Sequence, residues 1–540
     1  MGKNQTKHLD VDQAALAAIV ERAKSAPLSA EDCATLQGLF ATLAFLQQAL
    51  KEKGMSVQRL QQMLFGSKSE ATAKVVGKTE VKDEKAEKKE DGEEKKKGHG
   101  RNGVAAYSGA EKVKVPHPTL TAGQPCAGCL TGKVYSLEEP AKLVRITGCA
   151  PLNATVYECD RLRCNLCGEV FTAPSPEGVG EKKYDETAAS ITGLFKYGGG
   201  VPFNRIEKLQ GGMGIPLPAA TQWELVRDAA GLLKPAWEEL ANQAAQGDVM
   251  YNDDTTMKVL DLTKEQLRAA AADESEERTG IFTTGIVSQK HGGPVIALFF
   301  TGRQHAGENL ADVLAKRAVD LSAPIQMCDA LAANTAGDFQ TILANCISHS
   351  RRQFVDVAEH FPDECRYVLE TLGAVYVNDA LARQSNMTPE ERLALHQEKS
   401  RPLMTALETW AATQLKEHKV EPNSGLGKAI AYMMKHWKKL TLFLSEPGAP
   451  LDNNICERVL KKAILHRKNS LFYKTQNGAR VGDIFMSLIH TTELCHGNPF
   501  EYLVALLRNH EEVADSPADW MPWNYLETLS LPGAAPPTAR

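Results

Sequence analysis

The 540-residue sequence has no apolar run approaching the ~18 residues that a membrane-spanning helix requires, and its strongest apolar stretch, Pro294–Phe300, predicts a strand. Its N-terminus lacks an apolar signal core, so we expect a cytoplasmic protein. No segment recurs at the period of a solenoid repeat. The sequence therefore indicates neither a membrane protein nor a secreted or repeat protein.

Neither sign of charge dominates, because 62 lysines and arginines face 67 acids and leave a net charge of −5. With 43% apolar and 24% charged residues, global disorder is excluded. The near-neutral total argues at first against a nucleic-acid partner. However, residues 416–480 hold 13 lysines and arginines against 5 acids, whereas residues 247–278 hold 9 acids against 4 bases. The distribution of charge therefore allows a DNA partner that the total conceals.

The 12 cysteines are too scattered for a disulfide framework, but four of them form two C-x-x-C pairs, Cys126 with Cys129 and Cys164 with Cys167. Two residues between thiolates let both sulfurs reach one tetrahedral Zn²⁺. We therefore predict a structural zinc ribbon within residues 104–180. Unrelated buried or redox-active thiols are the alternative.

The segments around this module differ in composition. Residues 1–70 predict a helical N-terminus whose apolar 3-4 spacing favours a self-associating coiled coil over a helical hairpin. Residues 71–103 contain a balanced run of lysines and acids that predicts a disordered linker. Residues 185–246 predict helices. If the second of these helices is the recognition helix of a helix-turn-helix, Thr221, Gln222 and Arg227 would contact DNA. Ordinary packing of one helix against another is the alternative.

Residues 247–509 predict an α/β domain. Three strands are expected first, then a helix and a fourth strand, in the order Val249–Leu260, Thr279–Ser288, Pro294–Thr301, Asn309–Arg317 and Pro324–Met327. A helical insertion at about 338–445 interrupts the sheet pattern. Residues 510–540 predict an acidic, proline-rich tail.

Carboxylates occur where this sheet would form a site. Asp253 and Asp254 lie inside a first strand whose apolar residues include Val249, Met257, Val259 and Leu260, and Asp329 follows the fourth strand. Glu457 opens a later helix, for which Asn453 and Asn454 predict an N-cap. Three carboxylates from two strands and a helix would form a cage for two Mg²⁺ or Mn²⁺ ions. Taken singly, Asp329 could instead cap a helix, and Glu457 could pair with a lysine one turn later.

The segment 451–480 around Glu457 has a net charge of +5, and His466–Tyr473 within it mixes basic, amide and aromatic residues, which is typical of a surface that holds nucleic-acid strands. The predicted DNA-binding residues are Arg458, Lys461, Lys462, Arg467 and Lys468.

These motifs resemble those of transposases of the insertion sequence IS-66 family. The resemblance covers nearly the whole chain and includes both C-x-x-C pairs. The other matching segments are Leu64–Glu70, Pro202–Arg205 with Trp223, Cys346–Arg352, Asp452–Arg458, Arg467–Phe472 and Asn498–Leu503. The most specific among them is Asp452-Asn453-Asn454-Ile455-Cys456-Glu457-Arg458.

The resemblance implies a DDE transposase with an RNase H-like catalytic core that uses Mg²⁺ or Mn²⁺. Its triad would be Asp253, Asp329 and Glu457, and it would cleave element ends and transfer them into target DNA. Double-stranded DNA, a second copy of the chain and accessory proteins of the same element are the implied partners, with the nucleoid of a prokaryote as the location. The sequence departs from the family at Asp254, where a Glu is usual, and at Ala330-Leu331, where Gly-Tyr is usual.

These departures leave alternatives open. Either Asp253 or Asp254 could be the first ligand, but not both, because neighbouring strand residues face opposite sides. The chain could also be a zinc-ribbon DNA-binding regulator without catalysis, or a general RNase H-like nuclease. Cys346 and His349 form a C-x-x-H pair that could bind metal, although packing is the commoner explanation for such a pair.

Overall fold

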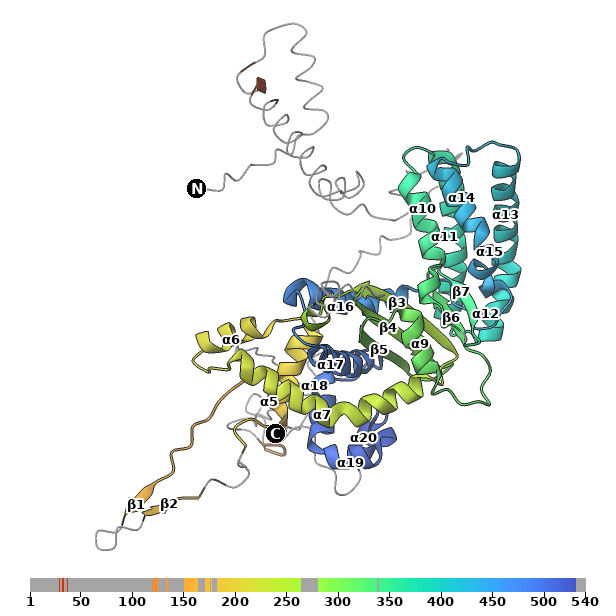
Figure 1. Ribbon diagram of the computed structural model, residues 1–540. Coiled ribbons are helices and arrows are strands. Elements are labelled where there is room, and N and C mark those ends of the chain that lie inside the picture. The colour runs from red at the N-terminus through yellow and green to blue at the C-terminus, as the bar shows by residue number, and fades with distance from the viewer. Residues whose placement is uncertain are drawn as a thin grey trace. The chain divides into compact units, whose positions relative to one another are not determined.

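The computed structural model describes residues 150–163, 170–174, 182–263, 280–337 and 339–530, together with residue 176 and a few short pieces before residue 135 (Figure 1). The predicted coiled coil, the charged linker and the four C-x-x-C cysteines lie outside these ranges. Among the described helices, none is both long and apolar enough to cross a membrane.

The chain divides into two compact units. One comprises Met1–Thr79, Ser350–Ala380 and Pro402–Met434, and its described part is built from helices. These are α10 (Ile347–Val357), α11 (Pro362–Gln384), α13 (Arg401–Lys416) and α14 (Gly425–Lys435), which contribute most of their length to it. The other unit comprises Glu80–His349, Leu381–Arg401 and Lys435–Arg540, and it contains the central sheet.

The central sheet has five strands in the order β5-β4-β3-β6-β7. Strands β3 (Val249–Thr256), β4 (Phe282–Gln289) and β5 (Val295–Gly302) are antiparallel neighbours. Helix α9 (Ala306–Leu314) then leads to β6 (Ile325–Cys328), which runs parallel to β3. The predicted order of three strands, a helix and a strand is thus confirmed, with ends that differ by at most four residues.

A fifth strand, β7 (Ile342–Asn345), was not predicted. It pairs in parallel with β6 and lies within the range assigned to the helical insertion, so helices begin at Ile347 rather than near 338. Four residues are too few to show the alternation of apolar and polar residues that identifies a strand in a sequence.

Helix α17 (Gln476–Leu494) lies along the edge strand β5 (Figure 1). Its side chains accept hydrogen bonds from alternate backbone N–H groups of that strand. Asp483 accepts from Thr301, Ser487 from Phe299, and Thr491 from Ala297, at 2.8, 3.0 and 3.0 Å. Four helical residues rise about 6 Å and two strand residues about 6.6 Å, so the two repeats match over this length. The helix thereby satisfies backbone groups that an edge strand leaves unpaired.

Helices α5 (Glu186–Gly193), α6 (Phe203–Gly212) and α7 (Ala219–Ala244) occupy the segment 185–246 that was predicted to be helical. The segment predicted as an acidic tail is folded as far as Ser530, however. It contains α19 (His510–Asp515) and α20 (Tyr525–Leu529), and its residues Val513, Trp520 and Met521 are at most 2% exposed. The tail prediction relied on the acidic and proline content and overlooked these widely spaced apolar side chains.

The contact between α17 and β5 predicts a specific loss of stability. Ser487→Ala leaves the buried N–H of Phe299 without an acceptor, so we expect the free energy of unfolding to fall by about 1–3 kcal/mol. Thr492→Val also deletes a buried hydroxyl, but that hydroxyl bonds only within the helix, to Leu488 O. We expect urea denaturation to show less than about 1 kcal/mol of loss for this control. Equal losses in the two variants would contradict the edge-strand role.

Candidate active site

Two of the predicted metal ligands, Asp253 and Asp329, lie on neighbouring parallel strands. The register of β3 and β6 pairs Tyr251 with Met327. Continued by two residues, this register aligns Asp253 with Asp329, and aligned residues of parallel strands point to the same face. The two carboxylates therefore lie at the C-terminal end of this strand pair, which is where open α/β sheets form their sites.

The pairing of β3 with β4 places Asp253 and Asp254 on opposite faces of the sheet, in different surroundings. Asp254 pairs with Thr284 on β4, and its Oδ2 lies 3.0 Å from Nδ1 of His305, the N-cap residue of α9. Asn309 of α9 donates to Oγ1 of the same Thr284 at 2.9 Å. Asp254 therefore faces α9, and Asp253 faces the opposite side of the sheet because strand side chains alternate.

Helix α16 (Asn454–Ser470) brings Glu457 to the face on which Asp253 lies. Gly285 pairs with Asp253, and a Cβ atom at Gly285 would lie only 3.0 Å from Leu460 on α16. The thiol of Cys456 donates to the carbonyl oxygen of the same glycine at 3.2 Å. The absence of a side chain at Gly285 thus lets α16 approach the sheet closely.

The three carboxylates influence one another electrostatically. Burial, together with the smaller effect of the negative charges on Asp329, Asp254 and Glu457, raises the pKa of Asp253 to about 7. Within the described part of the chain, none of Asp253, Asp329 and Glu457 forms an ion pair with a lysine or arginine. Three carboxylates without a lysine or arginine partner suit Mg²⁺ or Mn²⁺, because a divalent ion would offset the repulsion between them.

Four buried amide side chains join the segments that carry these acids, and the sequence analysis missed this role. Asn252 Nδ2 donates to Asn334 O at 2.7 Å, and Gln326 Nε2 donates to Asn252 Oδ1 at 3.0 Å. Asn453 Nδ2 donates to Asn252 O at 3.1 Å. All four side chains are at most 2% exposed. This amide network (Asn252, Gln326, Asn334, Asn453) links β3, β6, the turn after β6 and the start of α16.

The network also touches the acids themselves. Asn334 Nδ2 donates to Asp329 Oδ1 at 2.7 Å, and the N–H of Glu457 donates to Asn453 O at 3.1 Å. Asn453 is the N-cap residue of α16, but its side chain makes no capping bond, which corrects the predicted capping role. A signal for the network was present in the sequence, since an amide in an apolar strand requires a buried partner.

Cys346 and His349 lie beside Glu457. One ligand atom from each of these three residues lies within 4.8 Å of the others, and His349 Nε2 is 3.9 Å from Glu457 Oε1. His349 Nδ1 is buried without a hydrogen-bond partner. Burial raises the pKa of the Cys346 thiol to about 12, which opposes the thiolate form that binds metal. Glu457 therefore belongs to two groups of potential ligands, of which the carboxylate group contains the better donors.

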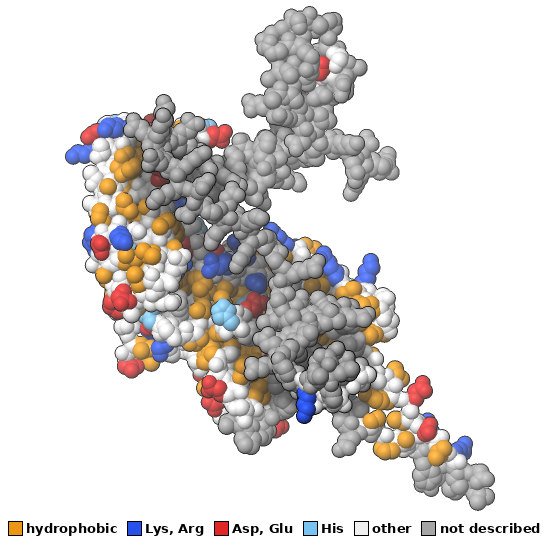
Figure 2. Space-filling view, turned by 180° about the vertical axis from the view of Figure 1, so that it is seen from behind, with side chains coloured by type: hydrophobic (Ala, Val, Ile, Leu, Met, Phe, Trp, Pro, Cys, Tyr) orange, Lys and Arg blue, Asp and Glu red, His pale blue; other side chains and the backbone are white. Residues whose placement is uncertain are grey.

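Three of the five basic residues predicted to bind DNA, namely Arg458, Lys461 and Lys468, are exposed on α16. They lie on the helix that carries Glu457, so a strand held by them would pass close to the carboxylates. On the face drawn in Figure 2, lysine and arginine side chains lie beside acidic ones near the middle of the view.

The other two basic residues have partners within the protein. Lys462 forms an ion pair with Glu493 on α17 at 3.1 Å. Arg467 donates to Thr255 Oγ1 at 3.1 Å and to both Oγ1 and the carbonyl oxygen of Thr256, so it anchors the end of β3 to α16. Their side chains therefore stabilise the site in addition to any contact with DNA.

The predicted helix-turn-helix is only partly consistent with the structure. Gln222 is fully buried, and its amide donates to Phe203 O and Leu217 O at 3.1 and 2.8 Å. Of the two alternatives left open for Gln222, the structure therefore supports helix packing, because its side chain holds the start of α7 against α6. Arg227 is exposed and pairs with Asp228 at 2.8 Å.

The four cysteines of the predicted zinc ribbon lie outside the described residues. The chain around the second pair forms an antiparallel pair of short strands, β1 (Arg161–Arg163) and β2 (Val170–Thr172). Cys164 and Cys167 lie between these strands in the sequence.

The geometry defines an α/β protein whose neighbouring strands β3 and β6 lead to Asp253 and Asp329, with Glu457 on a basic helix that packs against the same sheet. The sequence profile described as "Transposase IS66 family" matches residues 185–481, which is more than half of the chain. The chain therefore belongs to the IS66 family of transposases. The matched range includes both aspartates, Glu457 and the basic part of α16.

Two relatives come from Sinorhizobium fredii (strain NBRC 101917 / NGR234). "Uncharacterized protein y4hP" is 25% identical over 504 residues, which cover 87% of this chain and 88% of that protein. "Uncharacterized protein y4jD" is 26% identical over 383 residues, which cover 68% of this chain and 71% of that protein. Their names assign no activity, so they extend the similarity along the chain without adding a function.

The hydrogen bond from Asn334 to Asp329 should contribute measurably to the stability of the protein. Asn334→Ala removes a buried bond to a carboxylate, so we expect the free energy of unfolding to fall by about 1.5–3 kcal/mol in urea denaturation. Thr335→Val is the control, because its hydroxyl makes an exposed bond to Ala332 O in the same turn. We expect the control to change stability by less than about 0.5 kcal/mol. An Asn334 variant as stable as this control would show that the side chain of Asn334 does not hold Asp329 in place.

Proposed function

We propose that the protein is a DNA transposase in which the central sheet is an RNase H-like core and Asp253, Asp329 and Glu457 form the DDE triad. The observation that carries the proposal is the shared electrostatic neighbourhood of three acids from β3, β6 and α16, in a chain of the IS66 transposase family. The order of three antiparallel strands, a helix and parallel strands supports the same core.

Divalent ions held by these acids would lower the pKa of an attacking water and stabilise the charge that develops on the phosphate. The chain's own groups would orient the reaction. Asn334 fixes the Asp329 carboxylate, and Asp253 must lose its proton before it can act as a ligand. Exposed Arg458, Lys461 and Lys468 would hold backbone phosphates next to the acids. The same site would first cleave an element end and then join its 3′-hydroxyl to target DNA.

Further parts of the proposal concern residues outside the described ranges. A structural Zn²⁺ bound by Cys126, Cys129, Cys164 and Cys167 would fold a small module that contacts the element ends. The N-terminal coiled coil would pair two copies of the chain, since joining two ends requires two protomers. Accessory proteins of the same element are further expected partners.

The triad predicts the effect of removing one charge at a time. Asp253→Asn, Asp329→Asn and Glu457→Gln should each reduce Mg²⁺-dependent cleavage by more than about 100-fold, because each removes a metal ligand. The measurement is nicking of plasmid DNA that carries the element's ends. Asp254→Asn makes the same chemical change one residue away and on the opposite face, so it should keep most of the activity.

Other outcomes would change the assignment. An inactive Asp254 variant beside an active Asp253 variant would move the triad by one residue. Band shifts without products, in Mg²⁺ and in Mn²⁺, would identify a DNA-binding regulator. Cleavage that ignores the element ends would identify a general nuclease.

The raised pKa of Asp253 predicts that metal binding depends on pH. A carboxyl with a pKa of about 7 is mostly protonated at pH 6 and mostly ionised at pH 8, and only the ionised form binds a cation. Mn²⁺ affinity measured by calorimetry should therefore rise by about 10-fold between these values, and Asp253→Asn should abolish the rise. Cys346→Ser should bind Mn²⁺ as the unchanged protein does. Loss of binding in Cys346→Ser would instead assign the ion to Cys346, His349 and Glu457.

A further inference from the structure

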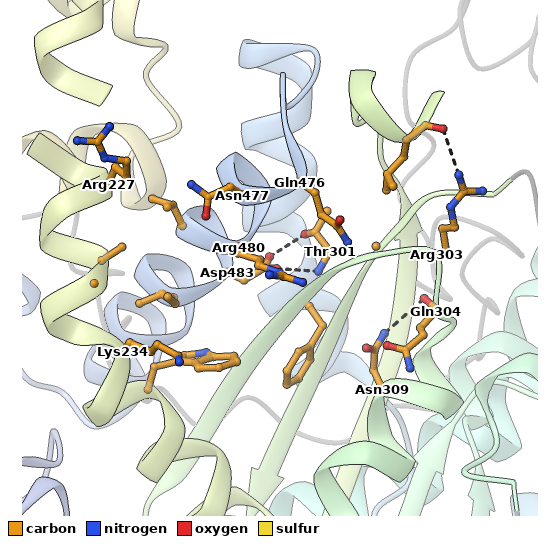
Figure 3. A pocket seen from close by; sticks show the side chains of 18 residues that line it. Arg227, Lys234, Thr301, Arg303, Gln304, Asn309, Gln476, Asn477, Arg480 and Asp483 are labelled. Atoms are coloured by element: carbon orange, nitrogen blue, oxygen red, sulfur yellow. Dashed lines mark hydrogen bonds between the residues drawn. The ribbon is translucent and has the colours of Figure 1, made fainter. Parts of the chain in front are cut away.

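A pocket of about 730 Å³ lies at the end of β5, where α7 and the start of α17 meet the strand (Figure 3). This volume is within the range of small-molecule binding sites. Four basic side chains line the pocket: Arg227 and Lys234 come from α7, Arg303 follows β5, and Arg480 belongs to α17. Such a concentration of positive charge in one concave site favours an anionic ligand.

Three of these cations, Arg227, Lys234 and Arg480, are only partly neutralised. Arg227 and Lys234 each pair with an acid on their own helix, at 2.8 and 3.3 Å, and both pairs are exposed and therefore weak. Arg480 is exposed and forms no ion pair with a described residue, although the charge of Asp483 acts on it. Both oxygens of Asp483 accept hydrogen bonds from Thr301, so this carboxylate is already engaged (Figure 3).

The same pocket contains two aromatic rings, Trp237 on α7 and Phe300 on β5. Their centroids are 5.9 Å apart in an edge-to-face arrangement, and the indole N–H donates to Ser487 Oγ at 3.3 Å. The rings are therefore held in place before any ligand arrives. Both are half-buried, which leaves part of their surface available to a flat ligand.

Polar groups complete the lining. Gln476 and Asn477, the first two residues of α17, present amides to the pocket together with the N-terminus of that helix. Amide side chains can both donate to and accept from the edge of a base. A phosphate is stabilised by arginines and by a helix N-terminus, and a base by aromatic faces. A nucleotide is the ligand that uses all of these groups at once.

The position of the pocket fits a DNA strand. Strands β3 and β5 are both antiparallel to β4, so they end at the same edge of the sheet. They are two strand spacings apart, or about 10 Å. Asp253 lies near the end of β3 and the pocket at the end of β5, although on the face of the sheet that Asp254 and α9 share. A DNA strand held at the carboxylates would therefore have to pass around this end of the sheet to place a nucleotide in the pocket.

We propose that this pocket binds a nucleoside phosphate unit, supplied as an unstacked nucleotide of the DNA strand that is held at the carboxylates. The base lies against Trp237 and Phe300, with its edge at Gln476 and Asn477, and the phosphate lies at Arg480 and Arg303. The inference rests on the proposed transposase function and adds to it a second contact that grips one nucleotide. Enzymes that act on DNA gain selectivity from unstacking a nucleotide, because weakly paired positions unstack most readily.

The test uses the full-length protein without added Mg²⁺ or Mn²⁺ and a short single-stranded oligonucleotide that carries one 2-aminopurine. Arg480→Gln should weaken binding, measured by fluorescence anisotropy at low salt, by about 10-fold, since it removes a phosphate contact. Trp237→Leu should weaken binding by about 5-fold or more and abolish the change in 2-aminopurine emission, since it removes the stacking surface. Lys290→Gln is the control, because it removes an exposed cation from the β4–β5 turn at the other end of the sheet.

Two results would overturn the proposal. If Arg480→Gln and Trp237→Leu bind as Lys290→Gln does, no nucleotide enters the pocket. Because Trp237 is half-buried, thermal melting must show that its variant is folded, and the exposed Arg480 variant tests the pocket independently. If deoxyadenosine monophosphate displaces the oligonucleotide at equal nucleotide concentration, the ligand is a free nucleotide and the assignment to a strand is overturned. The proposed function is tested separately by Mg²⁺-dependent cleavage of the element ends, so failure of that function and failure of this contact remain distinguishable.

Discussion

The buried amide network is the constraint on which the rest of the carboxylate site depends. Asp253, Asp329 and Glu457 are far apart in the sequence and repel one another when ionised, so nothing in their own chemistry brings them together. Asn252, Gln326, Asn334 and Asn453 supply the attraction that the acids lack, because each amide would be costly to bury without its partners. The network holds the backbone of β3, β6 and the start of α16 in fixed relative positions, and these backbone positions determine where the carboxylates lie.

The two faces of β3 are covered by different helices and hold different acids. The face of Asp253 is covered by α16, whose close approach depends on Gly285. Asp329 is aligned with Asp253 on this face, and α16 carries Glu457. The face of Asp254 is covered by α9, where His305 provides a partner for the second acid. Adjacent acids in one strand therefore have different environments, and the strand can contain both without placing four carboxylates in one cluster.

Much of the sheet could be predicted because its longer strands alternate or are continuously apolar, and because turn residues bound them. The positions of Asp253 and Asp329 at its C-terminal edge followed from the same pattern. The register of β3 with β6, the strand β7 and the partners of Asp254 could not be predicted, since they depend on contacts between distant segments. Gln222 illustrates the same limit, because a glutamine suited to reading DNA and one that holds two helices together look alike in a sequence.

The contact between α17 and β5 also restricts how this family can diverge. Asp483, Ser487 and Thr491 meet the strand because they recur at every fourth residue of an uninterrupted helix. Inserting or deleting one residue between them would turn the following side chains by about 100° away from the strand. Relatives at 25% identity can therefore exchange one oxygen-bearing side chain for another at these positions, but we expect the number of residues between them to stay the same.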